Sequence, residues 1–445
     1  MKIAYLFIFL LFAMTVSAQE RELKDSLRNE TLHRFNLHFQ TTYIYQYKPS
    51  FHSPYSALHS LSGKAEKANS LTATLFLGLR LWKGAAFFVN PEIAGGNGLS
   101  GSYGLSASTN GEIYRVGNPS PTLYMARVYL SQTIPLSKDC TTTADAANQF
   151  STAMPKNYLQ FQVGKYSLSD LFDNNTFSNS PRTQFLNWAI MNNGAWDYAA
   201  DVRGYTDAFS TTLQLNNFSY KTAVSLLPIT ANSPTLNYKL NEEFAINSEI
   251  SQAYKINGKQ GNIRVLGYYN YGNFGEYKQA LSDADKSGSI PDIVDSRAKG
   301  RKKIGIGFSA DQQVYEDLGL FVRVGMNDGK TETFCYTEAD QTISAGLTVN
   351  GEKWHRKNDV FGVAFVVNGI SKVHEDYLAK GGLGFELGDG KLNYGREKAL
   401  ESYYSLKPAK GPISLSANYQ FIMNPGYNKD RGPVNVFSFR LHVEF

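Results

Sequence analysis

The final segment of the chain, Asn435–Phe445, alternates between apolar and polar side chains from Phe437 to its end. Alternation with a period of two is the pattern of a β-strand whose two faces meet different surroundings. A soluble sandwich would seldom end on an exposed aromatic residue. A transmembrane strand, in contrast, needs a lipid-facing apolar row within about 9–11 residues and ends in an aromatic girdle. The segment therefore predicts the closing strand of an outer-membrane barrel. Its apolar face carries Phe437, Phe439, Leu441, Val443 and Phe445, and its polar face carries Ser438, Arg440, His442 and Glu444.

The same alternation recurs along the chain from Phe35 onward. In a soluble β-protein the apolar face of a strand would be core and the polar face solvated, so any one strand decides nothing. A long series of such strands fits that interpretation poorly. We therefore predict an all-β fold, a transmembrane antiparallel up-and-down β-barrel of about sixteen strands. The strands are expected at Phe35–Tyr47, Leu71–Leu81, Gly84–Asn90, Thr122–Ile134, Tyr158–Lys165, Gly204–Leu215, Phe218–Leu227, Phe244–Ile256, Gly261–Tyr271, Arg301–Asp311, Leu318–Asn327, Gln341–Asn350, Lys357–Asn368, Glu397–Leu406, Pro412–Phe421 and Asn435–Phe445.

Loop lengths support this topology. With both termini in the periplasm, the inner turns are short and the outer loops mostly long, as in bacterial outer-membrane barrels. One connection breaks the rule, because Pro135–Asn157 is long for an inner turn; either a periplasmic excursion lies there or the strand count is wrong nearby. The expected inner turns are 82–84, 216–217, 257–260, 312–317, 351–356 and 407–411, and the expected outer loops are 48–70, 91–121, 166–203, 228–243, 272–300, 328–340, 369–396 and 422–433.

The amino-terminal end predicts export. Lys2 supplies a positive charge, residues 3–14 form an apolar run, and Val16-Ser17-Ala18 provides small residues for signal peptidase, so residues 1–18 are expected to be removed. The alternative, a membrane anchor, would need roughly 18–20 apolar residues. No Cys follows Ala18, so a lipoprotein anchor is not expected. Residues 19–34 are expected to form a periplasmic leader, either a short helix or a disordered segment.

Composition adds little that would divide the chain. Its 445 residues contain no Pro/Ser-rich linker, repeat or charge block, so residues 35–445 are expected to form one barrel domain. The 28 Tyr and 28 Phe suit interfacial girdles. A formal net charge of +5 hints at tolerance for anions or contact with lipopolysaccharide and does not argue for nucleic acid. Cys140 falls at the periplasmic rim and Cys335 outside, too far apart for a disulfide.

Successive residues of a strand face lipid and lumen in turn, and this alternation, which we call strand parity, places several charged side chains inside the barrel. Mixed arginine and carboxylate groups in a pore can create a transverse field and exchange hydrogen bonds with sugar hydroxyls. The plainer interpretation is that these residues are solvated lumen charges whose pairing stabilises the barrel, and both interpretations remain open for each residue. The lumen set comprises Arg80, Arg127, Arg264, Arg323, Arg440, Glu92, Glu249, Glu401 and Glu444.

The segment Tyr166–Tyr198 is the richest candidate for a constriction. It holds many aromatic residues, which would be an aggregation liability in an exposed loop, so we expect the loop to turn into the lumen or to pack on itself. A short helix is expected to start at Pro181. Aromatic faces beside polar groups suit a pyranose ring, although a packed structural loop explains each residue equally well. The residues expected near the narrowest point are Asp170, Asp173, Arg182, Asn187 and Trp188.

Several strings in this region and near the carboxyl end are specific enough to suggest a family. The chain resembles the carbohydrate-selective porin family, the OprB-like porins, over most of the expected mature sequence. The resemblance implies an outer-membrane barrel that passes sugars, and carbohydrate is suggested by this resemblance alone. The strings are Gly164–Asp173, Phe185–Ala189, Trp196–Tyr205, Glu397–Tyr404, Tyr419–Gln420 and Asn424–Gly426.

Other functions are less well supported. No histidine can be paired with a candidate nucleophile, so no enzyme is expected. The spacing of the Cys and His residues does not suit a metal site, so no cofactor is expected. The primary hypothesis is passive diffusion of small sugars across the outer membrane of a Gram-negative bacterium. The alternatives are a general or anion-preferring porin and, with less support, a plugged-barrel adhesin. Expected partners are small sugars, outer-membrane lipid and lipopolysaccharide, with no nucleic acid, in a monomer or homotrimer.

Overall fold

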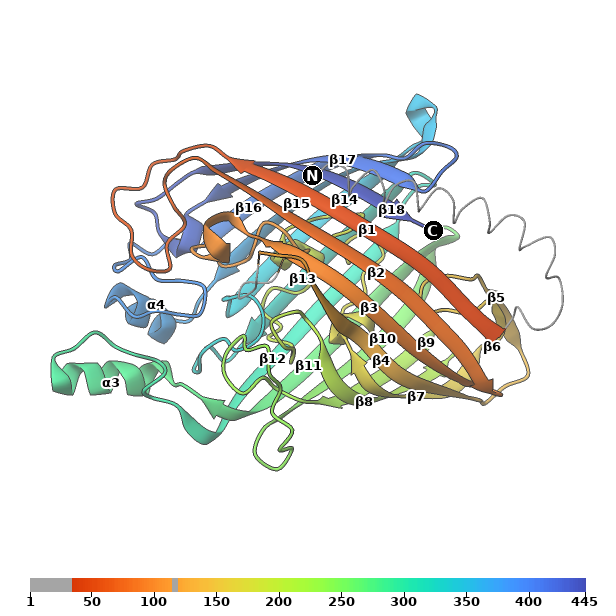
Figure 1. The fold of residues 1–445 in the computed structure, drawn as a ribbon, viewed down its shortest axis with the longest axis horizontal. Helices are drawn as coiled ribbons and strands as arrows, with labels where there is room; N and C mark the ends of the chain where they lie inside the picture. The colour runs from red at the N-terminus through yellow and green to blue at the C-terminus, as the bar shows by residue number, and fades with distance from the viewer. Residues whose placement is uncertain (1–33, 114–118) are drawn as a thin grey trace.

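The chain forms a closed antiparallel β-barrel (Figure 1). The computed structural model describes residues 34–113 and 119–445, so the expected signal peptide and nearly all of the expected leader lie outside the described residues. Sixteen strands close the barrel within this part of the chain, each paired with its neighbour along the chain and β1 paired with β18. The predicted fold class and strand number are therefore confirmed.

Every predicted strand is present, and three have the predicted boundaries: β10, β13 and β16. The largest differences lie in β2 and β3, which run several residues further toward the outer loops than predicted. The sixteen barrel strands are β1 Phe35–Lys48, β2 Glu66–Trp82, β3 Ala85–Asn97, β4 Thr122–Pro135, β7 Asn157–Tyr166, β8 Thr206–Leu215, β9 Phe218–Ser225, β10 Phe244–Ile256, β11 Lys259–Phe274, β12 Ala298–Gln313, β13 Leu318–Asn327, β14 Gln341–Gly351, β15 Arg356–Gly369, β16 Glu397–Leu406, β17 Ile413–Met423 and β18 Val434–Glu444.

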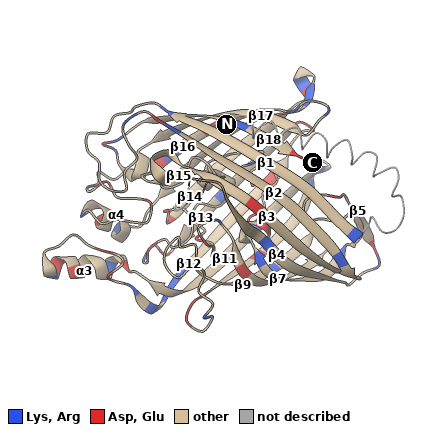
Figure 2. Ribbon diagram, in the orientation of Figure 1, with Lys and Arg blue, Asp and Glu red and all other residues tan. Residues whose placement is uncertain are grey.

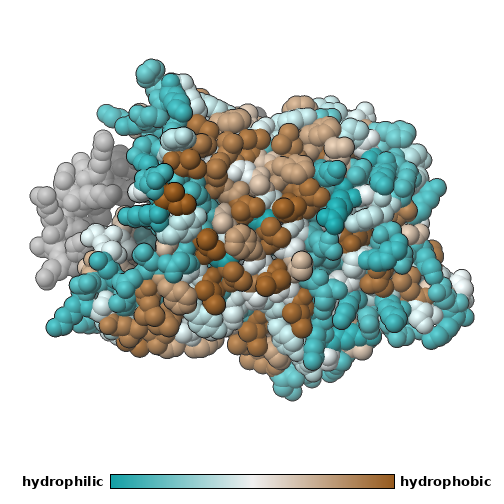
Figure 3. Space-filling view, turned by 180° about the vertical axis from the view of Figure 1, so that it is seen from behind, coloured by the Kyte–Doolittle hydropathy of each residue, from teal (hydrophilic) through white to brown (hydrophobic). Residues whose placement is uncertain are grey.

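The two faces of the strands differ as the sequence pattern predicts. On β18, Phe437 and Phe439 are 48% and 46% exposed on the outer face, whereas the lumen-facing Arg440 is 1% exposed. Apolar residues gather across the middle of the outer wall, with hydrophilic residues toward both ends (Figure 3). Such an apolar belt matches the hydrocarbon layer of a bilayer. Because the strands close into a barrel by hydrogen bonds, no open sheet edge is exposed to that layer.

The two ends of the barrel are unequal. Short turns join the strands at one end, and long loops bearing helices α3 and α4 extend from the other (Figure 1). No helix among the described residues is long and apolar enough to cross a membrane. The helical elements described are η2 Leu99–Ser102, η3 Leu168–Asp170, α2 Trp188–Met191, α3 Tyr277–Ser287, η4 Glu352–Trp354, α4 Lys372–Ala379 and η5 Pro425–Tyr427.

The long inner connection after β4 is a true excursion, and the strand count beside it is right. It contains a two-stranded sheet of β5, Cys140–Thr143, and β6, Thr152–Pro155. Cys140 on this excursion is exposed and Cys335 in an outer loop is buried, and both thiols are free. The two cysteines thus lie at opposite ends of the barrel, as the predicted topology placed them.

A buried histidine ties the outer loops together. His374 on α4 stacks on Tyr277 of α3 with ring centroids 4.2 Å apart, and its Nδ1 lies 3.1 Å from Asp340. Burial by itself would lower the pKa of His374, but the charge of Asp340 and hydrogen bonds to Asp340 and Glu338 outweigh burial and raise the pKa above 6.5. Burial would raise the pKa of Asp340, but His374 lowers it below 3.8.

We expect this loop cluster to be most stable between about pH 4 and pH 6.5. The raised pKa of His374 stabilises the folded cluster fully below pH 6.5, and this contribution is lost as the pH rises through the folded-state value. The lowered pKa of Asp340 stabilises it above pH 3.8, and this contribution is lost as the pH falls. Amide protection factors of α4, corrected for intrinsic exchange, should fall in the native chain as the pH rises above 6.5 and through the folded-state pKa of His374, and they should lose this dependence in H374Q.

Candidate functional site

The loop between β7 and β8, Ser167–Tyr205, lies inside the barrel. Its backbone is held by strands on the far side of the lumen, and each contact uses a lumen-facing side chain. Glu401 of β16 accepts hydrogen bonds from the amides of Leu186 and Asn187 at 2.7 and 2.9 Å. Arg440 of β18 donates to the carbonyls of Pro181 and Gln184, both at 2.7 Å. The loop therefore crosses the channel from β7 to β16 and β18.

Buried charges fix the first half of this loop. Asp173 adopts a positive φ of 52°, which turns the chain so that its carboxylate meets Arg323 of β13 at 2.9 Å. Arg323 also donates to the carbonyls of Ile190 and Ser178, and its side chain is fully buried. A carboxylate and a guanidinium buried together in this way must be paired and hydrogen-bonded, and removing one partner leaves the other uncompensated.

Aromatic side chains of the loop find cover against the barrel wall and a second outer loop. The ring of Trp188 stacks on that of Tyr336 with centroids 5.3 Å apart and planes at 8°. Phe185 packs between Phe321 and Tyr403, at 5.7 and 5.0 Å. The aromatic content that predicted an inward loop is thus buried in the lumen.

The predicted helix start at Pro181 is wrong. Residues 181–184 form a turn, and the one α-helix described in this loop, α2, begins at Trp188. Asn187 caps it, because its side chain accepts a hydrogen bond from the amide of Ala189 at 3.0 Å. The carbonyls of Pro181 and Gln184 are taken by Arg440, so they do not enter a helix ladder.

A cavity of about 310 Å³ lies between the inward loop and the wall formed by β3 and β4. Charged positions on β3 and β4 lie on this side of the barrel (Figure 2). Carboxylates, arginines and phenols alternate around the cavity, so hydrogen-bond donors and acceptors face it together. The lining includes Thr72, Glu92, Glu112, Tyr124, Arg127, Ser167, Asp170, Arg182, Trp188, Tyr198, Asp201, Arg203, Tyr205, Asn232 and Tyr336.

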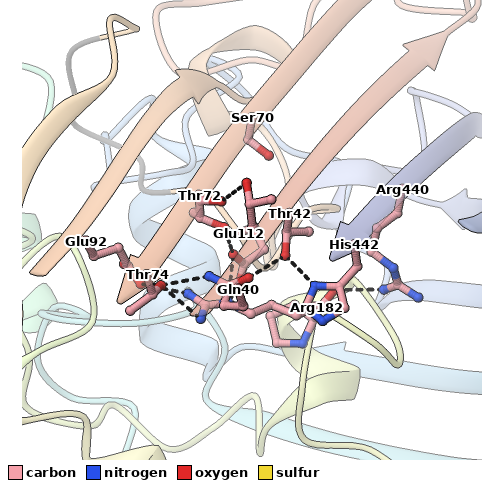
Figure 4. A network of polar contacts seen from close by, with 12 residues as sticks. Gln40, Thr42, Ser70, Thr72, Thr74, Glu92, Glu112, Arg182, Arg440 and His442 are labelled. Carbon is pink, nitrogen blue, oxygen red and sulfur yellow. Dashed lines mark hydrogen bonds and ion pairs between the residues drawn. The ribbon is translucent and has the colours of Figure 1, made fainter. Parts of the chain in front are cut away.

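Arg182 joins the loop to the wall across the cavity. Its Nη2 donates to Glu92 of β3 at 2.9 Å, and its Nε donates to Glu112 of the neighbouring outer loop at 3.0 Å. Thr74 and Tyr124 donate to the same Glu92 carboxylate. The network of Figure 4 continues through Thr72, Gln40, Thr42 and His442 along β2, β1 and β18.

A second ion pair closes the other side of the cavity. Arg127 of β4 binds Asp170 of the loop through two hydrogen bonds, at 2.7 and 2.6 Å. The guanidinium of Arg127 also lies over the ring of Tyr205 at 5.2 Å, and that of Arg203 lies over Tyr124 at 4.3 Å. Bidentate pairs and cation–π contacts hold these side chains in fixed positions, which pre-organises the polar groups of the cavity.

The structure separates the eleven sequence-predicted site residues into three groups. The first lines the cavity and consists of Glu92, Arg127, Asp170, Arg182 and Trp188. The second is outside the cavity lining and anchors the loop or its surroundings: Asp173, Asn187, Arg264, Arg323 and Glu401. Arg80 stands apart near the periplasmic end, where it donates to the carbonyl of Ser151. Contact with sugar remains a prediction for all of them.

Sequence reasoning missed several residues of the cavity. Tyr124 faces the lumen although parity with Arg127 assigns it to the lipid face, because a bulge shifts the register between Asn90 and Pro91 of the paired strand. Glu112 lies in a loop, where no periodicity predicts direction. Tyr198 and Tyr205 belong to a string that carried the family resemblance, so that string was the available signal for them.

Comparison with known proteins agrees with this architecture. A profile of the family described as "Carbohydrate-selective porin, OprB family" matches residues 71–445. The chain belongs to this family. Comparison with curated proteins gave no match.

Solved structures match nearly the whole chain. The high-pH structure of Pseudomonas putida OprB has a TM-score of 0.71 at 15% identity, covering 96% of this chain and 97% of that one. The low-pH structure of the same protein has a TM-score of 0.51 at 13% identity, covering 97% and 96%. The outer membrane channel DcaP of Acinetobacter baumannii has a TM-score of 0.51 at 11% identity, covering 92% and 97%. At these identities the structures establish the fold.

Family and fold together identify a multi-pass protein of the Gram-negative outer membrane, a channel for sugars. The predicted family, location and carbohydrate function are confirmed at this level. Within the described part of the chain, no group of three or more His, Cys, Asp or Glu side chains could hold a metal ion.

Proposed function

We propose that small sugars diffuse passively through this barrel by way of the cavity beside the inward loop, and that the cavity provides the selectivity. The observation that carries the proposal is the placement of Arg127, Arg182 and Glu92 between tyrosine rings, where the loop faces β3 and β4 across the cavity. A pyranose presents hydroxyls at its rim and C–H groups on its faces, which suits such a mixture of fixed polar groups and aromatic rings.

The pairing of the charges favours sugars over anions. Arg127 faces Asp170, and Arg182 faces both Glu92 and Glu112, so the guanidinium groups lack the excess positive charge that would concentrate anions. The same paired groups still offer hydrogen-bonding atoms to a neutral solute. This observation ranks a general or anion-preferring porin below a sugar porin.

Permeation of reconstituted liposomes tests the proposal. We expect mono- and disaccharides to enter faster than amino acids of similar size, and sugars to block ion current in planar bilayers. Equal rates would remove the selectivity, and no permeability at all would contradict a porin. A strong anion preference without sugar block would favour the anion-preferring alternative instead.

Removing one cavity carboxylate should shift ion selectivity. D170N keeps the side-chain size but leaves Arg127 without its bidentate partner at the cavity. An added unit of positive charge close to the ion path stabilises an anion and destabilises a cation by about 1 kcal/mol each in water-like surroundings, which predicts a rise of up to roughly thirtyfold in the anion-to-cation permeability ratio. Reversal potentials in a salt gradient measure this ratio, and an unchanged ratio would place the ion path away from Asp170.

Several further features belong to this proposal. We infer export with removal of residues 1–18, a periplasmic leader up to residue 34, contact of the barrel with lipid and lipopolysaccharide, and assembly as a monomer or homotrimer. Family and fold describe a channel, and we propose that it has no catalytic activity.

A further inference from the structure

The connection between β4 and β7 folds back into the barrel from the periplasmic end. Its two-stranded sheet, β5 and β6, lies at the end of the barrel opposite α3 and α4 (Figure 1). The segment between β5 and β6, residues 144–151, contacts side chains of β1, β2 and β3. We call this segment the periplasmic tip. A bridge between Ala146 and Gln149 closes it into a tight turn.

The wall residues that hold the periplasmic tip belong to the lumen face. On β1, Phe35 and Leu37 are 62% and 59% exposed toward lipid, so Asn36 and His38 between and beside them point inward. The amide of Asn36 donates to the side chain of Asp145 and to the carbonyls of Ala146 and Gln149, at 3.0, 2.9 and 3.1 Å. His38 contacts the same Asp145 at 3.0 Å.

Further contacts fix the rest of the tip. The amides of Asn148 and Asn90 bond each other reciprocally, both at 2.9 Å. The ring of Phe150 packs on Phe88 with centroids 5.7 Å apart, and the guanidinium of Arg80 lies over the Phe150 ring at 4.8 Å. With Phe88 of β3 and Asn90 both buried, the periplasmic tip occupies the part of the inner mouth bounded by β1–β3.

The periplasmic tip and the outer inward loop reach the same stretch of wall. Asn90, which holds the tip, and Glu92, which holds Arg182 of the outer loop, are two residues apart on one face of β3, about 7 Å along the strand. Asn90 also pairs across the ladder with Arg127, the partner of Asp170. Two inserted segments, one from each side of the membrane, therefore hold neighbouring positions on the same face of β3, and residues 144–151 stay outside the cavity lining.

We propose that the periplasmic tip is a second narrowing element of the channel, which sets the exit path of the permeant. It obstructs the mouth along β1–β3. On the other side of the barrel, a second cavity of about 280 Å³ is lined by Phe177 and Gln184 of the outer loop, by Gln313 and Tyr403 of the wall, and by Asp317 of the turn between β12 and β13. The permeant leaves on that side. This inference rests on the proposed sugar permeation, but its test does not require sugar.

Replacing residues 136–156 with a short turn tests the inference. Pro135 and Tyr158 are cross-strand partners at the ends of β4 and β7, so a hairpin turn can close the gap without disturbing the barrel ladder. We expect single-channel conductance in simple salt to rise about twofold, because the mouth along β1–β3 opens. Where sugar blocks the native channel, its half-blocking concentration should stay within about twofold, since the cavity is untouched.

A point variant and a control complete the test. N36A/N90A removes the amides that hold the periplasmic tip while keeping its length, and it should increase conductance noise and mean conductance. T141A/T142A alters the exposed strand β5 and should leave the current unchanged. Unchanged conductance in the replacement variant, with a protease-resistant barrel, would overturn the inference. A native channel that conducts ions without sugar block would contradict the proposed function and leave the conductance test of the tip intact.

Discussion

Replacing the inward loop Ser167–Tyr205 with a short turn is expected to raise single-channel conductance several-fold and to abolish block by sugar. The loop carries buried aromatic rings across the lumen and supplies one side of the cavity. Without it, a barrel of sixteen strands encloses a wide aqueous channel. The cavity then loses Asp170, Arg182, Trp188 and Tyr205 at once, so no fixed constellation remains to bind a sugar.

The barrel itself should tolerate this replacement. Tyr166 and Thr206 are cross-strand partners at the ends of β7 and β8, so a hairpin turn joins them in the native register. Arg323 and Glu401 lose their loop partners, but water enters the lumen and solvates them, which avoids the penalty of an unpaired charge in a dry interior. Protease resistance and heat-modifiable migration on gels report a folded barrel.

Planar-bilayer recordings of this variant then give a clear decision. A folded barrel with unchanged conductance would show that the loop does not limit the current. Higher conductance with intact sugar block would place the sugar site elsewhere in the barrel. The shorter change Phe177–Trp188 to a Gly/Ser linker should act in the same direction, because it removes Arg182 and the contact of Phe185 with the wall.

The barrel could be predicted from the sequence because the membrane imposes a simple rule on each strand. Lipid on one side and water on the other make every second residue apolar, and β10, β13 and β16 are found at the predicted boundaries. The rule weakens where the outer face leaves the lipid. The outer end of β3, with Pro91 and Gly95, continues beyond the predicted end at Asn90 because hydrogen bonds to β2 and β4 extend further than the apolar pattern.

The candidate site could be predicted only in part. Parity placed Arg127 and Glu92 in the lumen, and aromatic content predicted the inward loop, but neither distinguishes a side chain that faces a cavity from one that anchors a loop. Arg323 and Arg127 have the same strand parity, yet Arg323 is fully buried under the loop and Arg127 borders the cavity. That difference depends on which carboxylate the loop backbone brings to each arginine, and no periodic pattern contains it.

The long inner connection shows the same limit. Its length predicted an exception, but its return into the barrel depends on Asn36 and Asn90, which look like ordinary lumen-facing residues in the sequence. Tertiary contacts between segments more than fifty residues apart determine both inserted segments.

Substitution of Arg182 should have the largest effect of any single residue on sugar binding. Its guanidinium spans Glu92 and Glu112 with fixed geometry, and it links the loop to β3 across the cavity. R182M keeps much of the length and removes the charge, so the two carboxylates keep only their hydroxyl donors and face the cavity without a cationic partner. Because a hydrogen bond to a charged group contributes about 1.5–3 kcal/mol, we expect the half-blocking sugar concentration to rise at least about tenfold.

Charge and geometry can be separated with a second variant at the same position. R182K retains the positive charge but lacks the planar fork that binds two carboxylates together. We expect R182M to make the channel cation-selective, and R182K to keep the native ion selectivity while still weakening sugar block. R356Q removes an arginine charge at a periplasmic turn, where Arg356 pairs with Asp359, and serves as the control that should change neither property. If R182M and R356Q both give the same sugar block as the native chain, Arg182 does not contact the sugar path. In that case, removal of the charge that neutralises Glu92 and Glu112 has no effect on sugar binding.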